Sequence, residues 1–223
     1  MSARPIIVPP KSLKRQAGMA LLICLIFLTA LTLLGLSASA DAILQKKLAA
    51  NLQETERARQ SALSTLSWAE HWLLEQDGIA PDSCTEPCSG FHIHGPGDLP
   101  PKPEFEDLSW WLDHGHEAGV NPVNGDRITT VSAGSIDPPL WTIEAIHSSP
   151  ASEDGSTKLQ TWYRLLARGS GRTNAAVSVI ESTLVRSWPS NDDIDSTDTP
   201  GANTCPGSGE SAKCGRVSWR ELR

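Results

Sequence analysis

The chain has 223 residues and a formal net charge of −7 at pH 7, from 19 basic and 26 acidic side chains. Four of the basic residues, Arg4, Lys11, Lys14 and Arg15, lie in the first 18 positions, so the remainder carries 15 basic against 26 acidic groups, a charge of −11. This acidic balance excludes nucleic acid and anionic membrane surfaces as expected partners of the later part of the chain.

A basic leader is followed by a long uncharged segment. No charged side chain occurs between Met19 and Ala40, and the first acidic residue is Asp41. About 20 apolar residues in a helix span the hydrocarbon core of a bilayer, so residues 19–40 are predicted to cross a membrane. Because the leader is basic, its end is expected to stay in the cytoplasm and the chain after Asp41 to lie on the far side.

The helical pattern continues beyond the uncharged segment. Neither Pro nor Gly occurs between Ala40 and Asp77, and apolar residues recur at spacings of three, four or their multiples. An amphipathic half of the helix is therefore predicted over residues 41–77, and its apolar stripe needs a partner. Gly35 is the expected weak point at which the helix would bend or unwind. The stripe consists of Leu44, Leu48, Leu52, Ala62, Leu66, Ala69 and Leu73.

Four cysteines lie beyond the predicted membrane segment, as Cys84-x3-Cys88 and Cys205-x8-Cys214. Four cysteines allow three pairings, and closeness in sequence favours the two local disulfides. A zinc site is the competing interpretation, although neither spacing is the usual C-x2-C. Cys24, inside the uncharged segment, is expected to be an apolar residue of the helix.

Residues 78–223 are predicted to form one α+β domain. The expected fold is a C-terminal antiparallel β-meander packed on the amphipathic half of the long helix. A polar tail over residues 187–216 is expected to be a long loop. The other expected segments are a loop at 78–104, a short helix at 105–112, strands at 127–133, 140–147, 159–167 and 175–186, a Pro/Ser/Asp-rich linker at 148–157 and a hairpin connection at 169–174.

Five stretches of the chain resemble a known family. The stretches are Arg15-Gln-Ala-Gly18-Met-Ala-Leu-Leu, Leu31-Thr-Leu-Leu-Gly35-Leu-Ser, Leu44-Gln-Lys-Lys-Leu-Ala-Ala-Asn51-Leu, Tyr163-Arg-Leu-Leu-Ala-Arg-Gly169-Ser-Gly171-Arg and Gly215-Arg-Val-Ser-Trp219-Arg-Glu-Leu222. With a Gly before an apolar helix, an amphipathic continuation and a C-terminal meander, they resemble type IV pilin-like proteins, and more narrowly the PilX-type minor pilins of type IV pilus assembly.

The resemblance implies that residues 1–18 are a prepilin leader. The prepilin peptidase would cut between Gly18 and Met19, and the new N-terminus would be methylated. The helix would then leave the inner membrane and pack among the helices of other minor pilins and the major pilin, and the C-terminal domain would pass from the periplasm to the extracellular pilus. Motility, adhesion and DNA uptake all remain open as cellular roles.

The fifth residue of the implied mature chain is Ile23. Major pilins carry a Glu at this position, which is thought to pair with the N-terminal amine of a neighbour. Its absence suits a subunit at or near the filament tip, with other minor pilins and a large tip adhesin.

Two other functions stay open. A K-type pseudopilin of type II secretion also lacks the Glu, although that protein usually carries a larger insertion than a chain of this length has room for. Alternatively, Ala38-Ser39-Ala40 resembles a signal-peptidase site, whose use would release a secreted binding protein beginning at Asp41. Against this, the apolar run exceeds the roughly 7–15 residues of a signal-peptide core.

No catalytic constellation or cofactor motif is recognisable, so neither an enzyme nor a bound cofactor is expected. The sequence contains no nucleophile elbow and no phosphate-binding loop, which also disfavours an anchored envelope enzyme. Two weak metal alternatives remain. They are the histidine pairs His92/His94 and His114/His116, which lie in or beside loops, and the acidic segment 191–198, which lacks the Gly and the terminal Glu of the common calcium loop.

Overall fold

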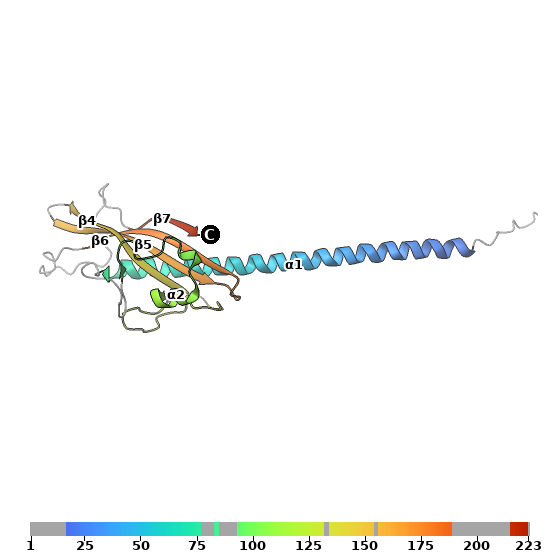
Figure 1. Cartoon of the computed structure of the whole chain (residues 1–223), viewed down its shortest axis with the longest axis horizontal. Coiled ribbons are helices and arrows are strands. Elements are labelled where there is room, and N and C mark those ends of the chain that lie inside the picture. Colours follow the sequence, from blue (N-terminus) through green and yellow to red (C-terminus); the bar gives the residue numbers. More distant parts are fainter. Residues whose placement is uncertain are drawn as a thin grey trace, which may run out of the picture. The chain divides into compact units, whose positions relative to one another are not determined.

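The computed structural model describes residues 17–76, 83–84, 93–131, 134–153, 156–188 and 215–222. The chain divides into two compact units, Met1–Ala50 and Asn51–Arg223. In chain order the elements are α1 (Ala17–Glu75), β1 (Ser83–Cys84), β2 (Ile93–His94), the 3-10 helix η1 (Pro103–Phe105), α2 (Leu108–His114), β3 (His116–Glu117), β4 (Leu140–Glu153), β5 (Ser156–Ser170), β6 (Val177–Trp188) and β7 (Gly215–Leu222) (Figure 1).

Helix α1 runs without a break for 59 residues, which confirms the predicted long helix. Leu and Ala dominate its first half, and the whole helix lacks Pro, so the backbone hydrogen-bond pattern is never interrupted. Gly35, the expected weak point, is helical, and no atom of another residue lies within 4 Å of the place where its Cβ would be.

The α+β class is confirmed, but the prediction of a purely antiparallel meander is wrong. Strands β4 to β7 do form an antiparallel series, and β3 pairs antiparallel with β4. Two short strands, however, add parallel pairs at the other side, β1 with β2 and β2 with β4. The result is a mixed seven-stranded sheet of order β1-β2-β4-β5-β6-β7 (Figure 1).

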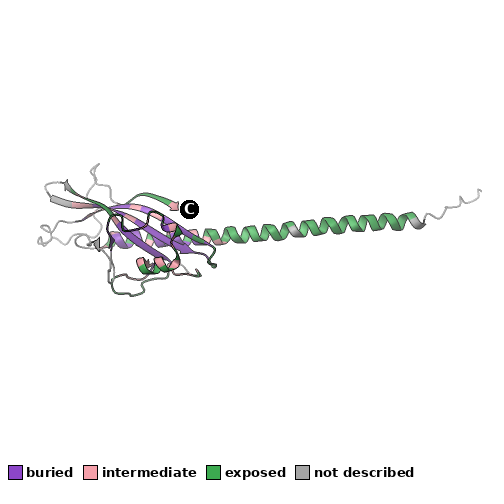
Figure 2. Ribbon diagram, viewed as in Figure 1, coloured by how far each residue is buried: buried purple, intermediate pink, exposed green. Residues whose placement is uncertain are grey.

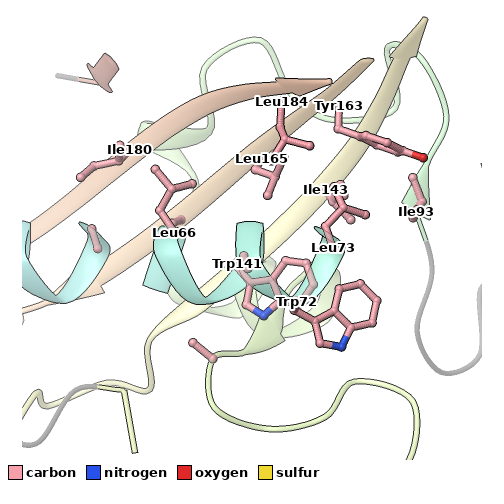
Figure 3. Packing of buried hydrophobic residues seen from close by; sticks show 14 of the residues in the cluster. Leu66, Trp72, Leu73, Ile93, Trp141, Ile143, Tyr163, Leu165, Ile180 and Leu184 are labelled. Carbon is pink, nitrogen blue, oxygen red and sulfur yellow. The ribbon is translucent and has the colours of Figure 1, made fainter. Parts of the chain in front are cut away.

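The main hydrophobic core lies between the sheet and residues 58–73 of α1. Alternating residues of a strand face opposite sides of a sheet, so Tyr163, Leu165 and Ala167 of β5 point toward this core. Leu66 and Leu73 of α1 meet them there, both with fully buried side chains (Figure 3). This inner core also holds Ala62, Ala69, Trp72, Ile93, Ala118, Trp141, Ile143, Ile180, Leu184 and Trp188.

A smaller outer cluster covers the opposite face of the sheet. Leu166 of β5 points away from the inner core and packs with Trp111 of α2, as do Leu99, Leu140 and Val179. Helix α2 begins at Leu108 rather than at the predicted residue 105, because the Asp107 side chain accepts a hydrogen bond from the Trp110 N–H and caps the helix there.

The prediction of a linker over residues 148–157 is wrong. Strand β4 continues to Glu153 and β5 begins at Ser156, so the described residues of this range belong to two paired antiparallel strands. Pro150 lies opposite Leu159 in this pairing. Proline is compatible with a strand when its missing N–H faces away from the partner, and β4 is an edge strand there among the described residues. The hairpin connection expected at 169–174 joins β5 to β6, although Gly169 and Ser170 themselves still pair with β6.

The predicted strand over residues 127–133 is also wrong for the described part, 127–131. Arg127 makes only an isolated bridge with Val120. The Gly119 carbonyl accepts hydrogen bonds from both the Ile128 and Thr129 N–H groups, which folds this segment into a compact loop instead. Gly119 has φ +83°, and a Cβ there would lie 2.2 Å from the Thr129 carbonyl oxygen.

Two further expectations are corrected at the ends of segments. In the predicted tail 187–216, the first two residues belong to β6 and the last two belong to β7. Residues 189–214 lie outside the described part. The apolar stripe of α1 is buried only from Ala62 onward, because Leu44, Leu48 and Leu52 are exposed.

Candidate functional site

The candidate site is the apolar half of α1, because its exposed surface is long and apolar. One helix near the N-terminus is long and apolar enough to cross a membrane, and its best 18-residue window has a mean hydropathy of 2.7. Every described side chain between Met19 and Ala50 is exposed (Figure 2). A surface that is apolar on all sides needs lipid or other apolar helices around it.

Three hydroxyl groups of this segment donate hydrogen bonds to its own backbone. Thr29 donates to the Ile26 carbonyl at 2.9 Å, Thr32 to the Thr29 carbonyl at 2.8 Å, and Ser37 to the Leu34 carbonyl at 3.0 Å. An unpaired hydroxyl in hydrocarbon would cost several kcal/mol, of the order of 4–8 by transfer to alkane. The segment therefore presents an apolar surface with few unpaired polar groups to its neighbours.

The residues predicted from the sequence lie along this half of the helix. Gly18 is in its first turns, and Met19 and Ile23 are exposed on it, at 67% and 48%. Cys24 carries an exposed free thiol, as expected for an apolar helix residue. Gly35 lies in an open stretch of helix. These positions share one exposed helix and are not gathered into a pocket.

The second half of α1, from Asn51, is held on the sheet by an unusually close backbone contact. Gly169 of β5 lies against α1, and a Cβ there would be 2.3 Å from the Ala62 nitrogen and 2.5 Å from the Ala58 carbonyl oxygen. Only glycine permits this approach, since the obstacles are backbone atoms that cannot rotate away. Sequence reasoning noted Gly169-Ser-Gly171 as a connection and missed this role.

An ion pair between a buried glutamate and an exposed arginine ties the last strand to the same half of α1. Arg216 Nε of β7 donates to Glu70 Oε1 at 2.8 Å, and Arg216 Nη2 donates to Glu70 Oε2. The Ser182 hydroxyl also donates to Glu70 Oε1, at 2.6 Å. The hydrogen bonding of Arg216 to the Glu70 carboxylate raises the pKa of Arg216. The partners are 146 residues apart, so no local pattern could have revealed the pair.

An arginine of β6 closes the C-terminal end of α1. Arg186 Nη1 donates to the Leu73 carbonyl and Nη2 to the Gln76 carbonyl. The same guanidinium lies 3.7 Å from the centre of the Trp188 ring. A cation at a helix C-terminus is favourable because the last carbonyls have no partner within the helix.

Two ionisable groups of the second unit, Glu54 and Tyr163, have displaced pKa values. The Arg172 N–H donates to Glu54 Oε2 at 2.7 Å and lowers the pKa of that carboxyl. Burial raises the pKa of Tyr163 to about 12. The Tyr163 hydroxyl accepts a hydrogen bond from Trp188 Nε1 at 2.8 Å.

Three of the described histidines, His94, His114 and His116, lie in an aromatic cluster. His94 Nε2 is 3.3 Å from the His114 carbonyl oxygen, and His114 Nδ1 is 2.9 Å from the Trp110 carbonyl oxygen. The His114 ring stacks on Trp110 at 4.7 Å, and the His116 ring lies 5.3 Å from Trp141. Within the described ranges, no three His, Cys, Asp or Glu side chains are arranged to hold a metal ion.

Several predicted positions lie outside the described residues: His92, Cys88, Cys205, Cys214 and the acidic segment 191–198. Cys84 is described only in its backbone, as part of β1. The two proposed disulfides therefore stay predictions.

Comparison of the chain with protein-family models, with curated proteins and with solved structures found no match.

Proposed function

We propose that the protein is a minor pilin that takes part in priming and assembly of a type IV pilus. It acts as a structural subunit, without catalytic activity, at or near the filament tip. Its partners are other minor pilins and the major pilin, met through the N-terminal helix, and a large tip adhesin. It begins as a single-pass inner-membrane protein with a cytoplasmic leader and a periplasmic domain, and ends in the extracellular pilus.

The observation that carries the proposal is the apolar half of α1, which continues without a break into a half packed on a sheet. Its membrane segment carries no charged side chain, and three of its hydroxyls bond to the helix itself. Such a segment can move from lipid to apolar neighbours without uncovering an unpaired charge. An assembly machine that extracts subunits from a membrane requires this property.

The position near the tip is supported by Ile23. A filament-body pilin carries a carboxylate at the fifth mature residue, which pairs with the amine of the next subunit. An aliphatic side chain cannot make that pair. A subunit with no pilin above it has no amine to neutralise.

The experiment that tests the proposal is N-terminal analysis of the mature protein, produced with prepilin peptidase. A methylated Met19 at the N-terminus is the expected result. A start at Asp41 would instead identify a secreted protein, and retention of Met1 a plain membrane anchor. Because pseudopilins share the Met19 start, recovery of the protein in sheared pilus fractions is the second expected result.

Two glycines of the same helix provide a matched pair of variants. Gly18→Val is expected to leave the leader attached, since it changes the residue before the cut. Gly35→Ala, 17 positions further along the helix, is expected to leave cleavage unchanged. Equal processing of both variants would contradict cleavage at Gly18.

The tip position is tested with Ile23→Glu. The number of pili per cell is expected to fall, because the new carboxylate meets no partner amine at the tip. Ile23→Gln serves as the control that adds polarity without charge. Unchanged piliation in Ile23→Glu would remove the support for the tip position.

A further inference from the structure

A polar pocket of about 240 Å³ lies within the second unit, beside residues 57–64 of α1. Its walls come from three places: the helix, the loop around Ser135, and the turn that follows β5. No carboxylate is among the described residues that line it. The lining side chains with hydrogen-bonding groups include Arg57, Gln60, Ser61, Ser64, Ser135 and Arg172.

Two guanidinium groups give the pocket its positive charge. Arg57 comes from α1 and Arg172 from the turn between β5 and β6. Glu54 lies just outside and holds both residues in place, since Oε1 pairs with Arg57 Nη1 and Oε2 accepts from the Arg172 backbone N–H at 2.7 Å. The two guanidinium cations therefore face one nearby carboxylate, that of Glu54, and both of its oxygens already accept hydrogen bonds. The charge is local, because the chain as a whole is acidic.

The floor of the pocket is preorganised. Ser170 is 1% exposed and is fixed by Asp137, whose N–H donates to its hydroxyl at 3.1 Å and whose carbonyl accepts from it at 3.3 Å. Ser61 is 4% exposed, and its oxygen receives a long hydrogen bond of 3.4 Å from Ser135. A hydrogen bond of that length is weak, so a ligand that approached would compete with it easily.

We propose that this pocket binds a small oxyanion, a carboxylate or phosphate group, through the guanidinium groups of Arg57 and Arg172. The Ser61 and Ser64 hydroxyls supply further donors. Planar guanidinium groups match the geometry of carboxylate and phosphate, and they keep their charge at every physiological pH. This site is independent of the pilus function proposed above, so either proposal can fail without the other.

The pocket volume indicates how large a group the pocket can hold. At about 30 Å³ per water in the liquid, the pocket corresponds to roughly eight water molecules. Pockets for drug-sized ligands measure about 300–1,000 Å³. The pocket therefore has room for a single charged group or a small acid.

The test is isothermal titration calorimetry on the full-length protein in detergent micelles. Sodium phosphate and sodium succinate are titrated separately, with ionic strength matched by sodium chloride. Saturable binding of at least one of them is expected. Arg172→Gln, which removes an exposed guanidinium and keeps the backbone N–H, should weaken binding at least tenfold, as should Arg57→Gln.

Arg127→Gln is the matched control, because Arg127 is an exposed arginine paired with Glu117 and does not line the pocket. It should bind like the unchanged protein, and circular dichroism should show that all three variants stay folded. Binding of phosphate alone identifies a phosphoryl ligand, binding of succinate alone a carboxylate, and binding of both a general oxyanion site. The proposal is overturned if neither anion saturates the protein below about 10 mM, if Arg172→Gln binds normally, or if Arg127→Gln is weakened equally.

Discussion

Both halves of α1 contain leucines and alanines, but these side chains are exposed in the first half and buried in much of the second. Leu28, in the first unit, is 63% exposed, whereas Leu66, in the second, is completely buried under the sheet. In the first half apolar residues occur on every side of the helix. In the second half most of them lie on the face toward the sheet, and charged residues such as Arg57 and Glu70 make ion pairs.

This difference shows that apolar character alone does not locate a protein core. An apolar helix is stable in water only if something covers it, and the sheet covers only the part from Ala58 onward. The first half must obtain its cover from a bilayer or from other chains. Matched substitutions in the two halves measure this contrast directly.

The largest effect is expected when the same leucine-to-alanine change is made in each half. Leu66→Ala should lower the free energy of unfolding by about 2–5 kcal/mol, because it opens a cavity in a closed core. Leu28→Ala should change it by less than about 0.5 kcal/mol, since no protein core surrounds that side chain. Denaturant unfolding in detergent, followed by tryptophan fluorescence, measures both, as all eight Trp residues lie at or beyond Trp68. Similar losses in the two variants would break the contrast.

A second pair of variants compares glycines. Gly169→Ala should destabilise the second unit by about 1–3 kcal/mol, because its Cβ would collide with backbone atoms of Ala58 and Ala62 and push the sheet from the helix. Gly35→Ala meets no atom within 4 Å and should instead favour the local helix by up to about 1 kcal/mol. The same unfolding assay, with helicity from circular dichroism, separates them. A neutral Gly169→Ala would mean that the close contact has room to relax.

The third effect concerns pH and acts only in the packed half. Burial places the pKa of Tyr163 at about 12, above its ordinary value of 10. The neutral phenol is therefore favoured in the folded state: its contribution is complete below pH 10 and is lost as the pH rises from 10 to about 12. Because Tyr163 is the single tyrosine of the chain, the ultraviolet absorbance of tyrosinate reports this group alone.

Tyr163→Phe provides the control for that titration. It should remove the alkaline absorbance change and cost about 1–3 kcal/mol, since the buried Trp188 Nε1 would lose its acceptor. A midpoint near pH 10 in the unchanged, folded protein would show that the phenol is reached by solvent.

Local pattern was sufficient for the long helix and for the approximate position of three strands. The absence of Pro and the recurrence of leucines and alanines are properties of neighbouring residues, so α1 could be predicted almost to its last residue. The strands predicted at 140–147, 159–167 and 175–186 all exist, but the first two are longer in the structure and the third is shifted by two residues. Pairing across the sheet extends a strand through residues such as Ser149 and Pro150, whose own preferences are for turns.

Contacts between distant residues could not be predicted. The two parallel pairs depend on β1 and β2. Each of these strands has two residues, which is too short to leave a periodic pattern. Strand β7 could not be predicted, because Val217 and Trp219 lie exposed at the edge of the sheet. Its residues therefore show no alternation of buried and exposed positions. The Glu70–Arg216 pair joins a helix to a strand 146 residues later.

The sequence by itself determined the positions that act through their place along the chain. Gly18, Met19 and Ile23 are located by counting from the basic leader, and the uncharged run between Met19 and Ala40 is a matter of composition. Only the tertiary structure decided which apolar residues form a core and which glycine is indispensable. The physical reason is that burial and close approach are properties of two surfaces that meet, and Leu66 and Gly169 acquire their roles only when the sheet lies on the helix.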